Sequence, residues 1–113
     1  MLTKEEIDNW NYNYYDIFGE KKMLTKGKDR LVENTLGLVG EAGEVAEKTK
    51  KLIRDKTRFS DEEILQELGD VLFYVTALSH IYNSNINEVM QLNVSKLDGR
   101  EARGTLKGSG DKR

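Results

Sequence analysis

The chain has 113 residues, of which 34% are charged and 37% hydrophobic, and its formal net charge is −2. These totals suit one small domain with a modest core, and they exclude the broad basic surface with which many proteins bind nucleic acid. The sequence contains no Cys, which excludes disulfides, a thiolate nucleophile and zinc-thiolate sites.

Membrane and secretory segments are not expected. Residues 1–6 carry no apolar run of the kind found in signal peptides, and no segment has the roughly 20 apolar residues that span a bilayer. We therefore expect a cytoplasmic protein with neither membrane nor nucleic acid as a partner. The sequence also contains no Pro, so long helices are permitted.

The first predicted helix covers residues 4–18. Thr3 and Glu6 have the spacing of a capping box, and apolar residues follow at helical spacing until Gly19. Residues 19–28 are polar and predict a loop. Trp10, Tyr14 and Tyr15 of this segment are candidates for stacking on a base, with Trp10 the best of them, whereas core or subunit packing is the simpler expectation for Tyr14.

The second predicted helix covers residues 29–55, in which leucine or valine recurs every seven residues from Leu31 to Leu52. It would be about 40 Å long, too long to be covered by one short helix, so we expect a bundle shared between subunits. Gly37, Gly40 and Gly43 each cost about 1 kcal/mol of helix propensity relative to Ala. Such costs suggest the close approach of another backbone or room for a ligand.

Two further helices are predicted. Ser60 and Glu63 form a capping box that starts a helix ending near Tyr82, and Asn85 with Glu88 can cap a helix over residues 86–99. The Gly-rich and basic residues after it have the composition of a disordered tail. The single His of the chain lies late in the third predicted helix, where we expect a packed or solvated side chain. The predicted fold class is all-α.

Two acidic pairs stand out on the second and third predicted helices. Glu41 and Glu44 form one pair, Glu67 and Asp70 the other, and residues three apart share a helix face. Both pairs are flanked by aliphatic residues and glycine, where carboxylates are costly unless they are paired or bound to metal. Carboxylate oxygens are the ligands that Mg²⁺ and Mn²⁺ prefer. The alternative is that these are surface charges of amphipathic helices.

Taken together, these motifs resemble the MazG-like all-α nucleoside triphosphate pyrophosphohydrolases. The two acidic pairs are separated by 22 residues, and residues 37–45 and 67–74 are similar to the two helical blocks of that family. Residues 93–100 are similar to a third block. The ending at residues 103–113 is similar to the tail of a compact, phage-type branch.

The resemblance implies one MazG-like domain over residues 1–113, a four-helix bundle completed by homo-oligomerisation as a dimer or tetramer. It also implies Mg²⁺-dependent hydrolysis of nucleoside triphosphates, chiefly deoxyribonucleotides, to the monophosphate and pyrophosphate, in nucleotide-pool cleansing or control. Mn²⁺ would be a substitute metal. The metal-binding and catalytic residues would be Glu41, Glu44, Glu67 and Asp70. The substrate-binding residues would be Tyr74, Asn93, Lys96, Arg100, Arg103, Ser109 and Asp111, in addition to Trp10.

The sequence departs from the family at one position and leaves two other functions open. Some members carry a lysine one turn before the second acidic pair, where this chain has Glu63. Either Glu63 is an additional ligand, or Lys48 or Lys51 supplies the missing cation. The alternative functions are a phosphoribosyl-ATP pyrophosphatase and a non-catalytic helical interaction module.

Overall fold

A computed structural model describes residues 3–5, 11–23 and 27–104 of the chain. Its ordered elements are α2 (Tyr12–Lys22), α3 (Arg30–Asp55), α4 (Asp61–Ile81) and α5 (Ile86–Ala102), and no strand occurs in the described ranges. The all-α prediction is confirmed. None of these helices is both long and apolar enough to cross a bilayer, and the cytoplasmic location stays a prediction.

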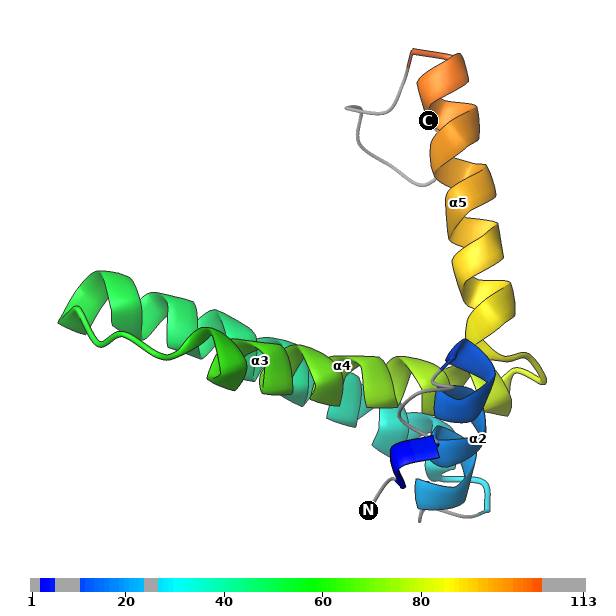
Figure 1. Ribbon diagram of the computed structural model, residues 1–113, viewed down its shortest axis with the longest axis horizontal. Coiled ribbons are helices and arrows are strands. Elements are labelled where there is room, and N and C mark those ends of the chain that lie inside the picture. The colour runs from blue at the N-terminus through cyan, green and yellow to red at the C-terminus, as the bar shows by residue number, and fades with distance from the viewer. Residues whose placement is uncertain (1–2, 6–10, 24–26, 105–113) are drawn as a thin grey trace.

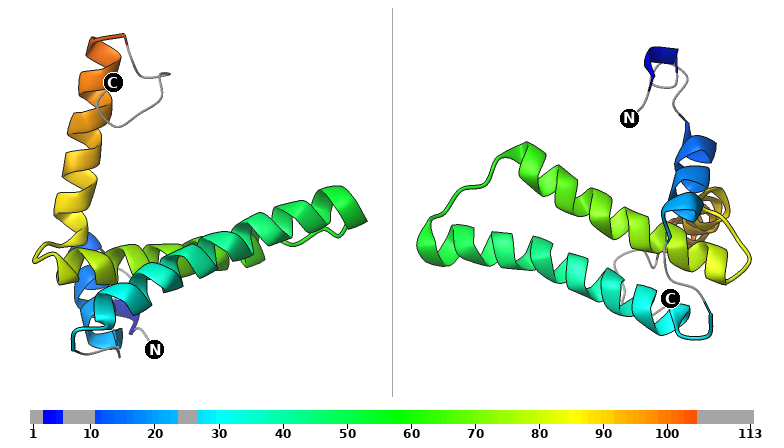
Figure 2. Two further views of the ribbon diagram at one scale, coloured as in Figure 1. Left: turned by 180° about the vertical axis from the view of Figure 1, so that it is seen from behind. Right: turned by 90° about the horizontal axis from the view of Figure 1, so that it is seen from below.

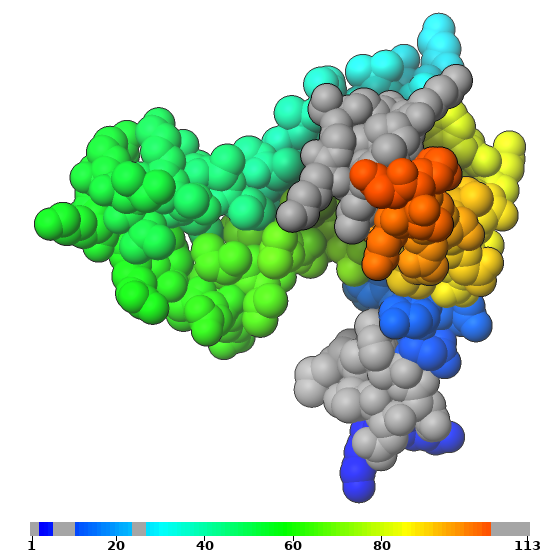
Figure 3. Space-filling view, turned by 90° about the horizontal axis from the view of Figure 1, so that it is seen from above, coloured from blue at the N-terminus to red at the C-terminus, as the bar shows by residue number. Residues whose placement is uncertain are grey.

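The long helices α3 and α4 lie side by side as a hairpin, which Figure 1 and both views of Figure 2 show. Helix α2 crosses one end of this hairpin, and α5 leads away from the same end (Figure 1). The opposite end, where α3 turns into α4, stands clear of the other helices in the space-filling view of Figure 3. Within one chain the four helices therefore do not surround a common core.

The predicted caps set the boundaries of the later helices. The Glu63 backbone N–H donates to Ser60 Oγ at 3.2 Å, and the Ser60 N–H donates to Glu63 Oε2 at 2.7 Å. This reciprocal capping box is confirmed, and it occupies the Glu63 carboxylate at the start of α4, which argues against Glu63 as an additional metal ligand. At α5 the Asn85 side chain accepts from the Glu88 N–H at 2.9 Å. That helix extends three residues past its predicted end.

The helix predicted over residues 4–18 is not continuous: Lys4 and Glu5 are helical, residues 6–10 lie outside the described residues, and Asn11 is not helical. Helix α2 begins after Asn11, whose side-chain oxygen accepts from the Tyr14 N–H at 3.0 Å, and it continues through Gly19 to Lys22. Glu6, part of the predicted capping box, lies outside the described residues. The helix passes through Gly19 because tertiary packing outweighs helix propensity there. A Cβ at Gly19 would lie 2.8 Å from Thr76 Cγ2, so the glycine lets α2 rest closely on α4.

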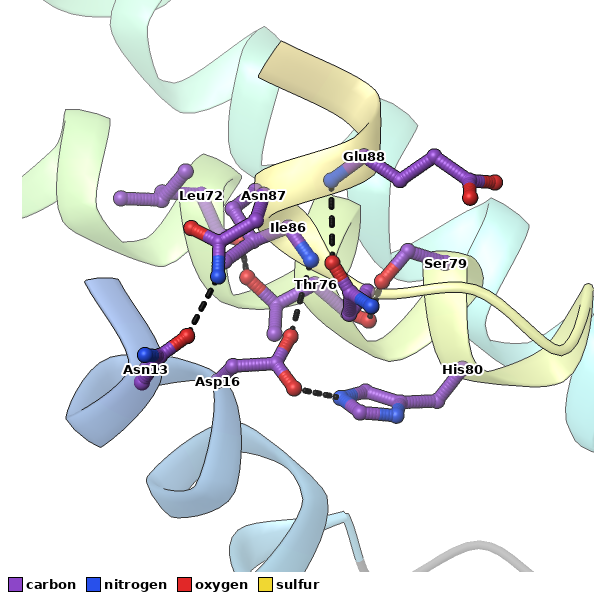
Figure 4. Close-up of polar contacts among 10 residues, drawn as sticks. Asn13, Asp16, Leu72, Thr76, Ser79, His80, Ile86, Asn87 and Glu88 are labelled. Atoms are coloured by element: carbon purple, nitrogen blue, oxygen red, sulfur yellow. Dashed lines mark hydrogen bonds and ion pairs between the residues drawn. The ribbon is translucent and has the colours of Figure 1, made fainter. Parts of the chain in front are cut away.

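Asp16 joins three helices at the crossing point (Figure 4). Its Oδ1 accepts a 2.8 Å hydrogen bond from the Ile86 N–H at the start of α5, and its Oδ2 lies 3.1 Å from His80 Nε2 on α4. The charge also faces the positive end of the α5 dipole. His80 is therefore a packed residue, one of the two outcomes expected for it. The Asp16 carboxylate fixes where α5 leaves the hairpin.

We expect Asp16→Ala to lower the free energy of unfolding by about 1–3 kcal/mol, because the buried Ile86 N–H loses its acceptor. Urea denaturation followed by circular dichroism measures this loss. Asp29→Ala is the matched control, since Asp29 precedes α3 without a side-chain capping hydrogen bond. Equal stability of the Asp16 variant and the wild-type protein would show that the hydrogen bond between Asp16 and Ile86 contributes nothing to the stability of the fold.

The packed interior of a single chain is small. Among the described residues, the buried hydrophobic side chains are only Met23, Ala77 and Ile86. The radius of gyration is 16.9 Å, whereas a compact domain of this size has a value of about 13 Å. Large apolar side chains of α3 and α4 remain exposed instead: Val32, Leu36, Val39, Leu52, Ile53, Leu65, Leu68 and Leu72.

Candidate metal and nucleotide site

The α3–α4 hairpin brings three of the four predicted carboxylates together. Glu41 of α3 and Glu67 and Asp70 of α4 each offer an oxygen, and these oxygens all lie within 4.8 Å of one another. Glu41 and Glu67 are half-buried, whereas Asp70 is exposed. We call these three residues the carboxylate cluster. The i, i+3 spacing on α4 aims both of its members at the facing helix.

Glu44, the fourth predicted ligand, is exposed and lies outside the carboxylate cluster. Its charge nevertheless reaches Glu41, because it is one of the causes that raise the pKa of Glu41. Glu44 thus lies on α3 beside the cluster, about one helical turn closer than Glu41 to the end where α3 leads into α4. Its role as a ligand stays a prediction.

Electrostatics show a surplus of negative charge in the cluster. The pKa of Glu41 is raised chiefly by partial burial, then by the charges of Asp70 and Glu67, and further by Glu44 and a hydrogen bond with Glu67. Three hard oxygen donors at this spacing fit a Mg²⁺ ion that keeps several water ligands. The donor set therefore suits a hard divalent cation, and Glu41, Glu67 and Asp70 are the residues that would hold it.

The raised pKa of Glu41 predicts how stability depends on pH. The folded protein holds the Glu41 proton more tightly than the unfolded chain does, so the ionised carboxylate destabilises the metal-free fold at neutral pH. This cost fades as the pH falls through the raised pKa, and it is absent below the ordinary value of 4.5. We expect Glu41→Gln to raise the melting temperature of the metal-free protein at pH 7 but not at pH 4.

Differential scanning fluorimetry in the presence of a chelator measures both melting temperatures. The same variant is expected to show a smaller upward shift with Mg²⁺ than the wild-type protein, because it has lost a ligand. A lower melting temperature for Glu41→Gln in chelator at pH 7 would contradict the charge surplus.

Lys48 reaches the cluster from α3. Its ammonium nitrogen lies 3.4 Å from Glu67 Oε1, and it also lies 4.8 Å from the centroid of the Phe59 ring. Lys48 and Lys51 were the two candidates to replace the lysine that this chain lacks at Glu63. Of these two, Lys48 is the one for which the structure shows an ion pair with the second acidic pair.

Tyr74 packs between α3 and α4. A Cβ at Gly37 would overlap the Tyr74 ring, and the ring also makes an edge contact with Phe73 at a centroid distance of 5.4 Å. One of the three unfavourable glycines of α3 therefore makes room for a side chain, whereas the predicted reasons were the approach of another backbone or room for a ligand. A Cβ at Gly40 or Gly43 would meet no atom within 4 Å, so clearance for a ligand stays a prediction there.

The predicted substrate-binding residues of α5 do not join the cluster within one chain. In the described part of the chain, α5 contacts α2 and α4 but not α3, and Figure 1 shows it leading away from the hairpin. Asn93, Lys96 and Arg103 are exposed, whereas Arg100 is buried. The other predicted contacts, Trp10, Ser109 and Asp111, lie outside the described residues.

Tyr15 is a neighbour of the cluster that the sequence did not single out for this position. The pKa of its phenol is raised by burial and then by the charge of Asp70, which places Tyr15 near that carboxylate. The side chain also lines a cavity of about 240 Å³ between α2, α4 and α5, which we call the tyrosine cavity; its lining residues are Tyr12, Tyr15, Leu72, Ile86 and Met90. The i, i+3 spacing of Tyr12 and Tyr15 places both on one face of α2, and this pattern in the sequence could have indicated that they line the same cavity.

Comparisons with known proteins cover the hairpin and α5. Residues 31–104 match the MazG nucleotide pyrophosphohydrolase domain. The "Gene 37 protein" of Mycobacterium phage L5 is 46% identical over 83 residues, which cover 70% of this chain and 73% of that protein. No solved structure matches the chain. The domain match contains the whole carboxylate cluster and leaves out α2.

Proposed function

We propose a nucleoside triphosphate pyrophosphohydrolase activity for this chain, which belongs to the MazG nucleotide pyrophosphohydrolase family. The observation that carries the proposal is the convergence of Glu41, Glu67 and Asp70, whose oxygens lie within 4.8 Å of one another. The substrates we propose are nucleoside triphosphates, chiefly the deoxyribonucleotides. The cofactor is Mg²⁺, with Mn²⁺ as a substitute, and the cellular role is cleansing or control of the nucleotide pool.

The proposed reaction breaks the bridge between the α- and β-phosphates. Water adds its oxygen to the α-phosphorus, the bridging oxygen leaves with pyrophosphate, and the proton of the water is released. The chemistry that Mg²⁺ supplies in such sites is neutralisation of phosphoryl charge and a lowered pKa of bound water. Asp70 of the cluster and Glu44 beside it are both exposed, and either carboxylate can accept the proton of the attacking water.

The tyrosine cavity is the place that we propose for the nucleoside end of the substrate. It adjoins the cluster through Tyr15, whose phenol lies near Asp70. Aromatic side chains stack on any base, because every base has a π-face. A cavity of about 240 Å³ is suited to a single base.

We further propose that two copies of the chain complete the site. The α5 residues Asn93, Lys96 and Arg100 would contact the sugar and phosphates, yet within one chain α5 does not contact α3. We call the exposed apolar side chains of α3 and α4 together the exposed apolar face, and exposed apolar surfaces of this kind mark interfaces. A homodimer or homotetramer that covers this face would supply α5 from a neighbouring subunit.

A substrate panel with product analysis tests the activity. The full chain is incubated with each ribo- and deoxyribonucleoside triphosphate, with and without Mg²⁺, and the products are separated by anion exchange. We expect nucleoside monophosphate and pyrophosphate in equal amounts, only when Mg²⁺ is present. Orthophosphate as the first product, or no turnover of any nucleotide at high protein concentration, would overturn the proposal. Cleavage of phosphoribosyl-ATP alone would instead support the alternative enzyme.

A further inference from the structure

A second cavity lies at the end of the hairpin where α3 turns into α4, and we call it the turn cavity. Its volume is about 250 Å³. Its walls include the apolar side chains Leu52, Phe59 and Ile64, and its polar lining includes Lys48, Arg58 and Asp61. Two cations and one carboxylate thus face a cavity that no part of the proposed reaction has used.

Lys48 belongs to both the turn cavity and the carboxylate cluster. Its ammonium nitrogen lies 3.4 Å from Glu67 Oε1, and its side chain is only 20% exposed. It also rests over the Phe59 ring, with 4.8 Å between the nitrogen and the ring centroid. Lys48 therefore connects the turn cavity, which it lines, to the metal-binding residue Glu67.

The charge of Lys48 is available to a substrate once the cluster has gained a metal ion. In the described part of the chain, Lys48 is the only cation that forms an ion pair with a member of the cluster. With a divalent ion held by the cluster, Glu67 would no longer need Lys48 for charge compensation, and the three N–H donors of the ammonium would be available to phosphoryl oxygens. Arg58 is exposed and forms no ion pair with another described residue, and its planar fork suits phosphate.

The order of features along α4 gives the substrate a direction. Ile64 lines the turn cavity, Glu67 and Asp70 follow in the cluster, and Leu72 lines the tyrosine cavity. The cluster thus lies between the two cavities. With the nucleoside end beside Tyr15, the far end of the triphosphate points toward Lys48.

We propose that Lys48 and Arg58 form a subsite for the two terminal phosphates of the substrate, which leave together as pyrophosphate. The subsite rests on the proposed pyrophosphohydrolase function and assigns it an orientation. Asp61 is the acidic residue of this cavity, and its charge opposes the bound anion. Lys48 is thus a substrate-binding residue as well as the partner of Glu67.

Isothermal titration calorimetry of the full chain with inorganic pyrophosphate in the presence of Mg²⁺ tests the subsite. Loss of one charge-assisted contact is expected to weaken pyrophosphate binding about tenfold to a hundredfold in Lys48→Met. Lys48→Arg keeps the charge and should restore most of the affinity, and Asp61→Asn should tighten binding. Lys50→Met is the matched control, because Lys50 is exposed and pairs with Glu47 at 3.8 Å.

Titration with Mg²⁺ alone separates this role from mere positioning of Glu67. Lys48→Met removes an ammonium group that competes with Mg²⁺ for Glu67. The variant should therefore bind Mg²⁺ as tightly as the wild-type protein does, or more tightly. Weaker Mg²⁺ binding with unchanged pyrophosphate binding would overturn the subsite and leave Lys48 as a positioning residue.

The failure of the subsite is distinguishable from the failure of the activity. Triphosphate hydrolysis by the wild-type protein, together with unchanged pyrophosphate binding by Lys48→Met, overturns the subsite alone. Absence of hydrolysis together with Lys48-dependent pyrophosphate binding overturns the activity alone.

Discussion

Replacement of Glu67 by Gln or of Asp70 by Asn is expected to lower the Mg²⁺-dependent turnover number about 10²- to 10³-fold. Each change removes one anionic oxygen from a set of three that lie within 4.8 Å of one another. The remaining carboxylates then hold the metal ion too weakly, or in the wrong place, to neutralise the triphosphate. The measurement is pyrophosphate release at saturating nucleotide, with helical content checked by circular dichroism.

Glu33→Gln is the matched control for these variants. Glu33 lies in the first turn of α3, is exposed, and is not part of the carboxylate cluster. It undergoes the same loss of charge, and we expect its turnover number to stay within about twofold of the wild-type value, since distant surface substitutions have small effects. Wild-type turnover in both the Glu67 and Asp70 variants would show that the cluster is not the active site.

The second large effect is expected at the exposed apolar face. Leu36 of α3 is 65% exposed in the single chain, and we expect Leu36→Glu to convert the proposed oligomer to monomers with loss of activity. A charge buried at a subunit interface without a partner costs about 3 kcal/mol or more, which corresponds to a weakening of association above about a hundredfold. Size-exclusion chromatography with light scattering measures the mass, and pyrophosphate release measures the activity.

Leu36→Met is the control for this substitution, because it replaces the same exposed side chain with an apolar one of similar volume. The apolar face then gains no charge, and mass and activity should stay unchanged. A wild-type protein that is monomeric and fully active would disprove completion of the site by a second copy.

The starts of α4 and α5 could be predicted because local capping chemistry determines them. The Ser60 and Asn85 side chains both accept the backbone hydrogen bonds that their sequence context predicts. The boundaries of α2 could not, since its passage through Gly19 depends on the long-range contact with Thr76. Asn11, the residue that caps α2, stands inside the helix predicted over residues 4–18 and interrupts it.

The candidate site, like the fold, could be predicted from the sequence only in part. Helical spacing was enough to predict that Glu67 and Asp70 share a face, and a hairpin then brings Glu41 to them. Spacing alone could not predict that Glu44 stays outside the cluster, nor that Tyr15 approaches Asp70 from another helix. These outcomes depend on the crossing of α2 over the hairpin and on the rotation of α3 against α4.

Hydrolysis in ¹⁸O-labelled water tests the central claim most directly. The full chain is incubated with Mg²⁺ and the best substrate of the panel, and the products are analysed by mass spectrometry. Attack at the α-phosphorus predicts one ¹⁸O atom in the nucleoside monophosphate and unlabelled pyrophosphate. Label in pyrophosphate would contradict attack at the α-phosphorus, and release of orthophosphate in place of pyrophosphate would contradict the assignment of this carboxylate cluster to a pyrophosphohydrolase.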